Sequence, residues 1–251
     1  MVWPMGFEAV KQAGMNPVDS RGIVYIDSGS LDFQDFLIGY VHLPRDVIIG
    51  NEGLQRFVEK SPHPLVSMLS SPHPGRYVLG FESQGKKYVT VDSSGQEVLY
   101  LYEDGEFWAC SNSFLLLVEK LVGRGKLLRP NWPAIYGFFH NSGKHLGEHL
   151  FSLETTIKGI RVVRQEVSLE ICHQGSLREV ECKVSDRICT REEYLDVLRD
   201  YLSSQVGLVR LLAHAASHSA PIQVELSGGY DSRFVLAMLG AANVNPDKYF
   251  V

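Results

Sequence analysis

One stretch near the carboxyl end constrains the fold most: residues 222–239 carry a β-prone run, a Ser-Gly-Gly-Tyr-Asp-Ser turn and a helix-prone run. The β-prone run contains Ile222, Val224 and Leu226. Two glycines let the backbone turn sharply and approach a ligand without a Cβ in the way. Successive amides of such a turn point into one concavity, which the positive end of the helix dipole backs. The order strand, glycine turn, helix therefore predicts a phosphate-binding loop.

The side chains of this turn add to the prediction. The hydroxyls of Ser227 and Ser232 can donate hydrogen bonds to phosphate oxygens. The Asp231 carboxylate would repel a bare phosphate, but a Mg²⁺ ion between the two removes the conflict, because carboxylates are its usual protein ligands. The turn is not a Walker loop, which requires a lysine before the final Ser or Thr. The turn therefore predicts binding of a phosphate group together with Mg²⁺, and Asp231 is the predicted metal ligand.

Composition limits the other classes of function. The chain has 251 residues, of which 45% are hydrophobic and 21% charged, a balance that suits one large or two modest globular domains. A formal net charge of −5 gives no electrostatic reason to expect a nucleic acid or an anionic membrane as partner. No apolar run is long enough to span a membrane, and no signal peptide is recognisable.

The cysteines indicate the compartment. There are four, without a CxxC pair: Cys110, Cys172, Cys182 and Cys189. We therefore expect reduced thiols and a cytoplasmic protein.

The first part of the chain reads as short strands separated by Gly, Asp and Ser. The expected strands include residues 22–26, 76–81, 87–91, 98–102, 160–163 and 167–171. Residues 113–121 and 132–139 are expected to be helical. This pattern predicts an α+β domain built on antiparallel strands.

The composition then changes near residue 190. Thr190-Arg-Glu-Glu193 is a capping box, which opens a helix expected to run to about His218 and to lead into the strand of the glycine turn. We predict three parts: residues 1–175 as the first domain, 176–190 as a linker and 191–251 as the beginning of an α/β parallel-sheet domain. A single strand–helix unit cannot bury its own apolar surface. We therefore expect the natural protein to continue, and this chain alone to show weak or no catalysis.

Several motifs together resemble a known family. Ser227-Gly-Gly-Tyr-Asp-Ser232 resembles the pyrophosphate-loop signature Ser-Gly-Gly-x-Asp-Ser of ATP pyrophosphatases. Upstream, residues 92–100 resemble the Asp-x-x-Gly-x-x-x-Leu-Tyr segment of glutamine-dependent asparagine synthetases. Residues 107–111 and 155–160 resemble the next two elements of that family, in the same order. The resemblance runs from about residue 75 to the carboxyl end.

The resemblance implies a fold and an activity. The fold is a glutaminase-like domain of the N-terminal-nucleophile hydrolase type, an antiparallel sheet sandwich between helices, followed by a pyrophosphate-loop (HUP) synthetase domain. The activity is an ATP-dependent ligase reaction, in which a carboxylate is adenylated and then attacked by ammonia or an amine. Carried over by motif position, Ser227, Gly228, Gly229, Asp231 and Ser232 bind the pyrophosphate part of ATP, and Asp231 also faces Mg²⁺. The implied partner is a small-molecule or peptide carboxylate, and a homodimer stays open.

The departures from the family concern glutamine hydrolysis. The family uses a cysteine exposed as the first residue after Met removal, whereas position 2 is Val2 and the first cysteine is Cys110. Asn112 stands where the family has Glu. We assign no catalytic residue and expect a scaffold without glutaminase activity. The alternative is a non-catalytic pseudoenzyme or interaction protein that retains this scaffold.

Three further features of the sequence each have a functional and a structural interpretation. His145 and His149 have the i, i+4 spacing of a zinc pair, but nearby glycines favour a loop. Residues 172–189 contain three cysteines, for which a metal site is the less favoured interpretation. Arg233 follows the glycine turn and either reaches phosphate or lies exposed on the helix.

Overall fold

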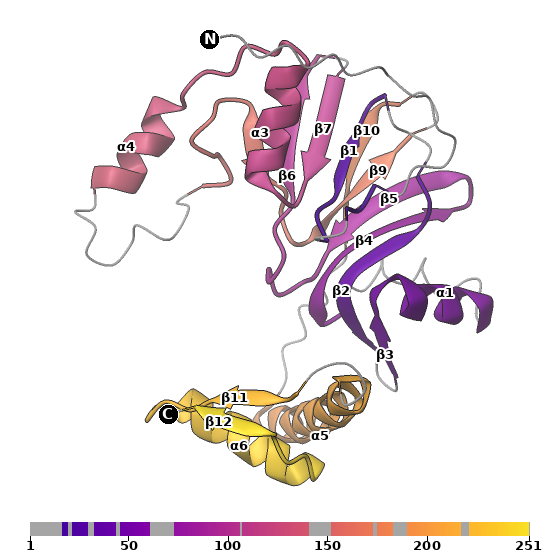
Figure 1. Ribbon diagram of the computed structural model, residues 1–251, viewed down its shortest axis with the longest axis vertical. Helices are drawn as coiled ribbons and strands as arrows, with labels where there is room; N and C mark the ends of the chain where they lie inside the picture. The colour runs from indigo at the N-terminus through magenta and orange to yellow at the C-terminus, as the bar shows by residue number, and fades with distance from the viewer. Residues whose placement is uncertain are drawn as a thin grey trace.

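The computed structural model describes residues 17–19, 22–29, 33–43, 46–60, 73–105, 107–140, 152–172, 175–182, 190–216 and 221–250. The fold is mixed α+β, with two antiparallel sheets in its larger part and a small parallel pair near the carboxyl end (Figure 1).

The larger sheet has six strands. In spatial order they are β10 (Leu177–Glu181), β9 (Val167–Ile171), β5 (Lys86–Val91), β4 (Gly75–Ser83), β2 (Phe36–Leu43) and β3 (Asp46–Ile49). The smaller sheet has four strands, in the order β1 (Tyr25–Asp27), β7 (Phe107–Ser111), β6 (Tyr100–Asp104) and β8 (Ile160–Val162). Every pairing within these two sheets is antiparallel.

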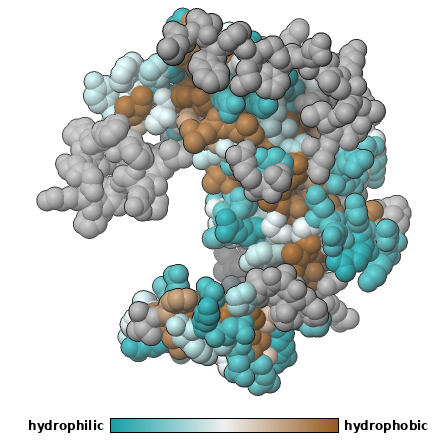
Figure 2. Space-filling view, viewed as in Figure 1, coloured by the Kyte–Doolittle hydropathy of each residue, from teal (hydrophilic) through white to brown (hydrophobic). Residues whose placement is uncertain are grey.

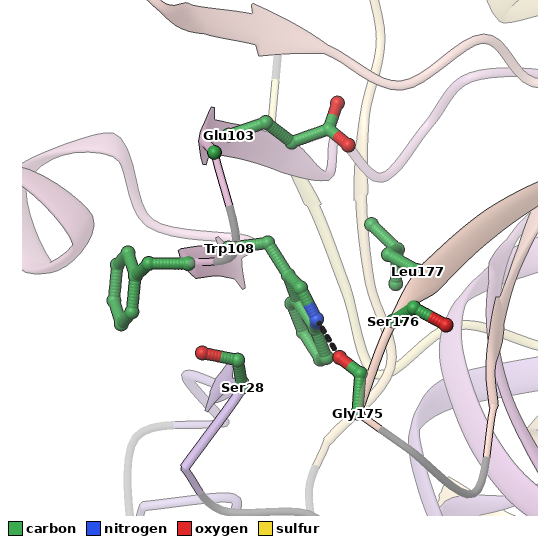
Figure 3. A pocket seen from close by; sticks show the side chains of 8 residues that line it. Ser28, Glu103, Trp108, Gly175, Ser176 and Leu177 are labelled. Carbon is green, nitrogen blue, oxygen red and sulfur yellow. Dashed lines mark hydrogen bonds between the residues drawn. The ribbon is translucent and has the colours of Figure 1, made fainter.

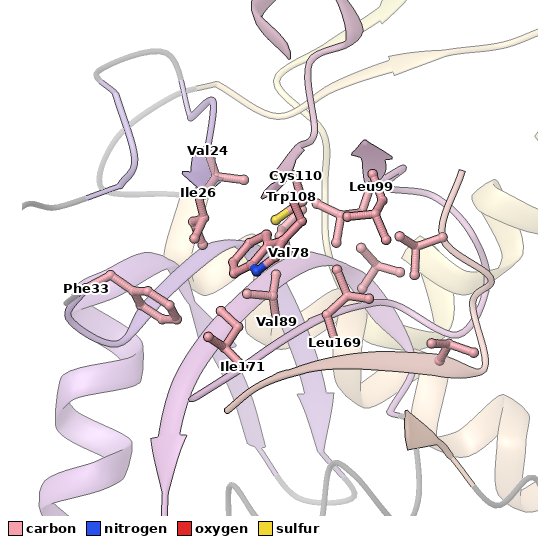
Figure 4. Close-up of a cluster of buried hydrophobic side chains, with 14 of the residues drawn as sticks. Val24, Ile26, Phe33, Val78, Val89, Leu99, Trp108, Cys110, Leu169 and Ile171 are labelled. Atoms are coloured by element: carbon pink, nitrogen blue, oxygen red, sulfur yellow. The ribbon is translucent and has the colours of Figure 1, made fainter. Parts of the chain in front are cut away.

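The two sheets face each other across one apolar core. Because side chains alternate along a strand, each strand sends every second residue inward. Figure 4 shows side chains from both sheets meeting in this layer. The smaller sheet contributes Val24, Ile26, Leu99, Leu101, Trp108 and Cys110, and the larger sheet contributes Phe36, Val78, Val89, Val91, Leu169 and Ile171.

A helix covers the outer face of each sheet. Helix α1 (Gly50–Lys60) packs on the larger sheet, where Leu54 joins Leu37, Tyr77 and Leu79. Helix α3 (Phe114–Gly123) packs on the smaller sheet through Leu117 and Leu121, which meet Tyr102, Ala109 and Ile160. There are thus three apolar clusters: one between the sheets, one under α1 and one under α3. They confirm the prediction of two antiparallel sheets between helices.

The chain crosses from the larger to the smaller sheet in the turn between β5 and β6. Asp92 lies fully buried there, and its carboxylate accepts hydrogen bonds from the amides of Ser94, Gln96 and Glu97 at 3.1, 2.9 and 2.8 Å. The Ser94 hydroxyl adds a fourth bond at 2.7 Å. Gly95 takes a positive φ of 69°, which a residue with a side chain adopts with strain. The turn is therefore specified by Asp and Gly.

The third resembling segment upstream of the glycine turn, residues 155–160, also has a structural part. Thr155 is buried, and its hydroxyl lies 2.8 Å from the carbonyl oxygen of Ile160 and 3.1 Å from that of Ile157. These bonds close the turn that leads into β8, so this segment holds the edge of the smaller sheet.

The helices of the C-terminal part begin where the sequence predicts. Helix α5 (Arg191–Ala216) opens with the predicted capping box: the Thr190 amide donates to the Glu193 carboxylate at 2.8 Å, and the Glu193 amide donates to the Thr190 hydroxyl at 3.3 Å. Earlier in the chain, helix α4 (Trp132–His140) covers the predicted residues 132–139. Strand β10 lies inside the predicted linker 176–190, and the three-part division of the chain stays a prediction.

A small unit follows α5. Strand β11 (Gln223–Glu225) pairs in parallel with β12 (Lys248–Phe250), and helix α6 (Tyr230–Ala242) connects them. Figure 2 shows apolar residues on the visible surface of this part. The large exposed apolar or aromatic side chains of α6 and β12 are Tyr230, Phe234, Val235, Leu236, Tyr249 and Phe250. A two-stranded sheet with one connecting helix leaves this surface open, as predicted.

Among the described residues, no helix combines the length and the apolar character needed to cross a lipid bilayer.

We expect Trp108→Phe to destabilise the sandwich. The Trp108 indole N–H, buried between the sheets, donates to the Gly175 carbonyl at 2.6 Å, so that a strand of one sheet is tied to a turn of the other (Figure 3). Phenylalanine leaves that carbonyl unpaired and lowers the free energy of unfolding by about 1–3 kcal/mol. Urea denaturation measures the change, with Trp132→Phe as control. Trp132 is 59% exposed, and a loss at Trp108 no larger than the control would contradict the prediction.

We expect Glu170 to stabilise the larger sheet in a pH-dependent way. Burial alone would raise the pKa of Glu170, but hydrogen bonds from Lys86 and Tyr88 at 3.1 Å hold the pKa below its usual value. A lowered pKa in the folded state means that ionised Glu170 adds stability above the unfolded-state pKa, and that this contribution is lost as pH falls through the folded-state pKa. The contribution is on the order of 1 kcal/mol, because Lys86 is partly exposed and solvent screens it.

The measurement is the free energy of unfolding of the wild type and of Glu170→Gln between pH 7 and pH 3. The difference between them should shrink as pH falls. Glu59→Gln, at an exposed position of α1, should show no such trend. A constant Glu170 difference across this range would count against the prediction.

Candidate functional site

The predicted phosphate loop connects β11 to α6. Leu226 continues β11, since its amide donates to the Phe250 carbonyl at 2.7 Å. Residues 227–229 then turn into the helix, whose first residue is Tyr230. The helix ends at Asn243, which adopts the left-handed conformation with φ of 55° and closes the last turn through the carbonyls of Leu239 and Gly240. The observed order of strand, turn and helix is the predicted one.

Hydrogen bonds within the motif fix the loop. The amide of Ser227 donates to the Ser232 hydroxyl oxygen at 2.9 Å, and the two hydroxyl oxygens lie 2.8 Å apart. The Gly229 amide makes a longer bond of 3.4 Å to the Ser227 hydroxyl. The first and last residues of the motif are thereby tied together, and the residues between them bow outward.

The start of α6 has no side-chain cap. Gly229 is the N-cap and provides no side-chain hydrogen bond, whereas the Ser113 hydroxyl caps α3. The first amides of a helix have no acceptor within the helix itself. The Asp231 side chain belongs to this first turn and is exposed. The loop thus combines amide donors, two hydroxyls and one carboxylate at the surface.

The two glycines border open space. Neither has a positive φ, so the backbone conformation does not itself demand glycine. A Cβ placed on Gly228 would meet no atom within 4 Å, and one on Gly229 would meet only the Ser227 hydroxyl at 3.3 Å. Neither packing nor backbone conformation therefore requires glycine at 228.

This donor set fits phosphate and Mg²⁺. Magnesium is commonly held by one or two carboxylates together with substrate phosphates and water. Asp231 supplies one carboxylate beside amides that attract phosphate oxygens. Within the described ranges, no group of three His, Cys, Asp or Glu side chains is arranged to hold a metal on its own. The zinc interpretation of His145 and His149 lies outside the described residues.

The described cysteines differ in access. Cys110 is fully buried between the sheets, and burial, helped by nearby Asp27, raises the pKa of its thiol to about 12. Cys182 is also buried, with its sulfur 3.4 Å from the Ser168 hydroxyl. Cys172 is half-buried and lies 3.8 Å from a Glu170 oxygen. Cys110, the first cysteine of the chain, cannot supply a thiolate for glutamine hydrolysis.

Asn112, which departs from the family pattern, has a structural part. Its side-chain oxygen accepts the Val24 amide at 2.9 Å, and its side-chain nitrogen donates to the Gly22 carbonyl at 3.2 Å. These bonds hold the start of β1 against the end of β7. We therefore assign Asn112 to the support of β1.

A cavity of about 570 Å³ opens at one end of the sandwich (Figure 3). It is lined by Ser28, Glu103, Gly105, Phe107, Trp108, Gly175, Ser176 and Leu177. The Glu103 carboxylate accepts from Arg161 at 2.9 Å, and the Trp108 indole is engaged by Gly175. No histidine or cysteine of the described chain lines this cavity. Ser28 and Ser176 therefore have no histidine beside them that could act as a general base.

Comparison with known proteins gives limited information. No protein-family model matches the chain, and no curated protein matches it. Among solved structures it is similar to glutamine phosphoribosylpyrophosphate amidotransferase from B. subtilis, complexed with ADP and GMP, with 15% identity and a TM-score of 0.28 over 80% of this chain and 38% of that one. A structure described as the allosteric regulatory enzyme of purine biosynthesis gives 15% identity, a TM-score of 0.28, and coverage of 80% and 37%.

The chain thus spans less than two fifths of the length of these solved structures. At this identity and TM-score the similarity decides nothing about activity. The layered arrangement described above follows from the packing of this chain's own residues.

We expect thiol reagents to distinguish the cysteines of the folded protein. Because the Cys110 thiol is buried and its pKa is raised to about 12, it should stay unmodified, while half-buried Cys172 reacts. Mass spectrometry of peptides after brief treatment with iodoacetamide at pH 8 measures both sites. Denatured protein is the control, in which both should react. Equal labelling of Cys110 and Cys172 in the folded protein would show that the thiol is accessible.

Proposed function

We propose that this chain carries the nucleotide-binding part of an ATP-dependent, amide-forming ligase of the asparagine synthetase type, joined to a glutaminase-like scaffold without glutaminase activity. One observation carries the proposal: the Ser-Gly-Gly-Tyr-Asp-Ser motif forms an exposed loop between a strand and a helix, with space above Gly228. The layered sandwich supports it further, because this is the arrangement that the resemblance implies.

In the proposed site, the amides of the loop bind oxygens of the β- and γ-phosphates. Of the Ser227 and Ser232 hydroxyls, which pair with each other at 2.8 Å, the one that accepts can point its own proton to the same oxygens. Asp231 would hold Mg²⁺, which when bound neutralises charge on the phosphate oxygens. Amides aimed at a departing pyrophosphate stabilise the charge that develops on it. The substrate would be a small-molecule or peptide carboxylate, and the nitrogen would come from ammonia or an amine.

The absence of glutaminase activity is also part of the proposal. It is supported by the burial of Cys110, the first cysteine in the sequence, whose thiol is not accessible in the folded chain. In the scaffold, the residues of the resembling segments serve as hydrogen-bond partners of turns, as Asp92 and Thr155 do. A domain of this kind can keep its fold without the catalytic group.

We expect Gly228→Ala and Asp231→Asn to weaken MgATP binding by about tenfold or more. The alanine methyl fills the space above the loop, and the asparagine removes the charge that holds the metal. Neither change should alter the melting temperature, because the Cβ meets no atom within 4 Å and Asp231 is exposed. Isothermal titration calorimetry with MgATP measures the affinity.

Asp200→Asn is the matched control, because it removes an equal charge from an exposed position of α5. It should bind MgATP as the wild type does. If both loop variants bind MgATP with unchanged affinity, or if the wild type binds none, the proposed function is wrong.

A further inference from the structure

Arg233 folds back over the loop that precedes it. Its Nη2 atom lies 3.4 Å from the carbonyl oxygen of Gly228, to which it donates a hydrogen bond. The guanidinium carbon lies 5.6 Å from the centre of the Tyr230 ring. Long side chains in a helix lean toward its N-terminus, so a residue one turn into α6 covers the first turn and the loop. From the sequence, Arg233 could either reach the loop or lie exposed on the helix; in the structure its charge lies beside the loop.

This position is unusual for a cation. The N-terminal end of a helix carries partial positive charge, and cations are favoured at the opposite end. At this end of α6 the guanidinium adds its charge to the partial positive charge of the helix, and the Asp231 carboxylate in the same turn offsets part of it. A multiply charged anion at the loop would be attracted by the remaining positive charge.

Tyr230 gives the guanidinium a platform. Its side chain is 87% exposed, an uncommon state for a large aromatic residue, and Arg233 lies over its ring. Stacking on an aromatic ring orients the planar guanidinium and leaves its N–H edges free to bond. The single bond to the Gly228 carbonyl is long, so a phosphate oxygen can replace that partner at little cost.

We propose that Arg233 is a specificity residue of the loop, which binds the outer phosphate of a polyphosphate and so selects diphosphate and triphosphate groups over a single phosphate. The inference rests on the proposed function, since it concerns the same loop. The amides of residues 228–231 would hold one phosphate, and the guanidinium, in bidentate contact, the next. Tyr230 acts as a positioning residue through the orientation of Arg233.

The experiment compares affinities for inorganic pyrophosphate and orthophosphate, measured by calorimetry with Mg²⁺ present. Arg233→Gln should weaken pyrophosphate binding by about tenfold and orthophosphate binding much less, so that the ratio of the two affinities falls. Arg233→Lys should give an intermediate loss, because an ammonium keeps the charge but not the bidentate contact. Arg199→Gln, at an exposed position of α5 paired with Asp196, removes an equal charge and should leave the ratio unchanged.

Tyr230→Ala tests the platform. Alone it should weaken pyrophosphate binding by about threefold, and in the Arg233→Gln background it should add nothing, since the guanidinium it orients is gone. Circular dichroism confirms that each variant is folded.

Two results would overturn the inference and leave the proposed function standing, provided that the wild type binds MgATP. In the first, Arg233→Gln has the same ratio of pyrophosphate to orthophosphate affinity as the wild type. In the second, Arg199→Gln lowers that ratio as much as Arg233→Gln does. A wild-type protein that binds neither MgATP nor pyrophosphate overturns the proposed function and this inference together.

Discussion

The buried carboxylate of Asp92 is the interaction on which the sandwich depends. It lies where the chain leaves the larger sheet and enters the smaller one, and it receives three amides and one hydroxyl. The turn itself lies at the surface, but its amides cannot join a strand, and the buried Asp92 carboxylate serves as their common acceptor. The turn thus holds the point at which the chain passes from β5 to β6, whose pairing with β7 and β8 completes the smaller sheet.

The contacts that stabilise the two sheets do not depend on a catalytic group. Asp92, Thr155 and the Trp108–Gly175 contact hold turns and sheets together, and none of them requires an exposed nucleophile. Cys110 occupies the core as an apolar side chain. The segments around Asp92 and Thr155 are accounted for in this structure by the hydrogen bonds that close their turns.

Much of the fold could be predicted from local patterns, but its spatial order could not. The capping box at Thr190 and the alternation in residues 87–91 act within one element, so they are legible in sequence. Helix α1 was not predicted, although the signal is present in the sequence: Leu54, Phe57 and Val58 have the i, i+3, i+4 spacing of one helical face, and that face packs on the sheet. The order β10-β9-β5-β4-β2-β3 depends on pairings between distant segments. For the loop, the motif predicted the backbone path but not the direction of the Arg233 side chain, which depends on the neighbouring ring of Tyr230.

The glycine turn is exposed to solvent, which limits how strongly any single contact could hold a ligand there. Ser227, Gly228, Gly229 and Asp231 are all at the surface, where water and salt weaken each single contact. One phosphate held by a few solvated amides would bind weakly, so useful affinity requires several charge-assisted bonds made at once. The loop meets this requirement in advance, because the Ser227–Ser232 hydrogen bonds fix its shape before any ligand arrives. Preorganised donors lose little entropy on binding. In the proposed site, a ligand with two or more linked phosphates and a metal between them and Asp231 would gain from every donor at once, whereas a singly charged anion would gain from only part of the set.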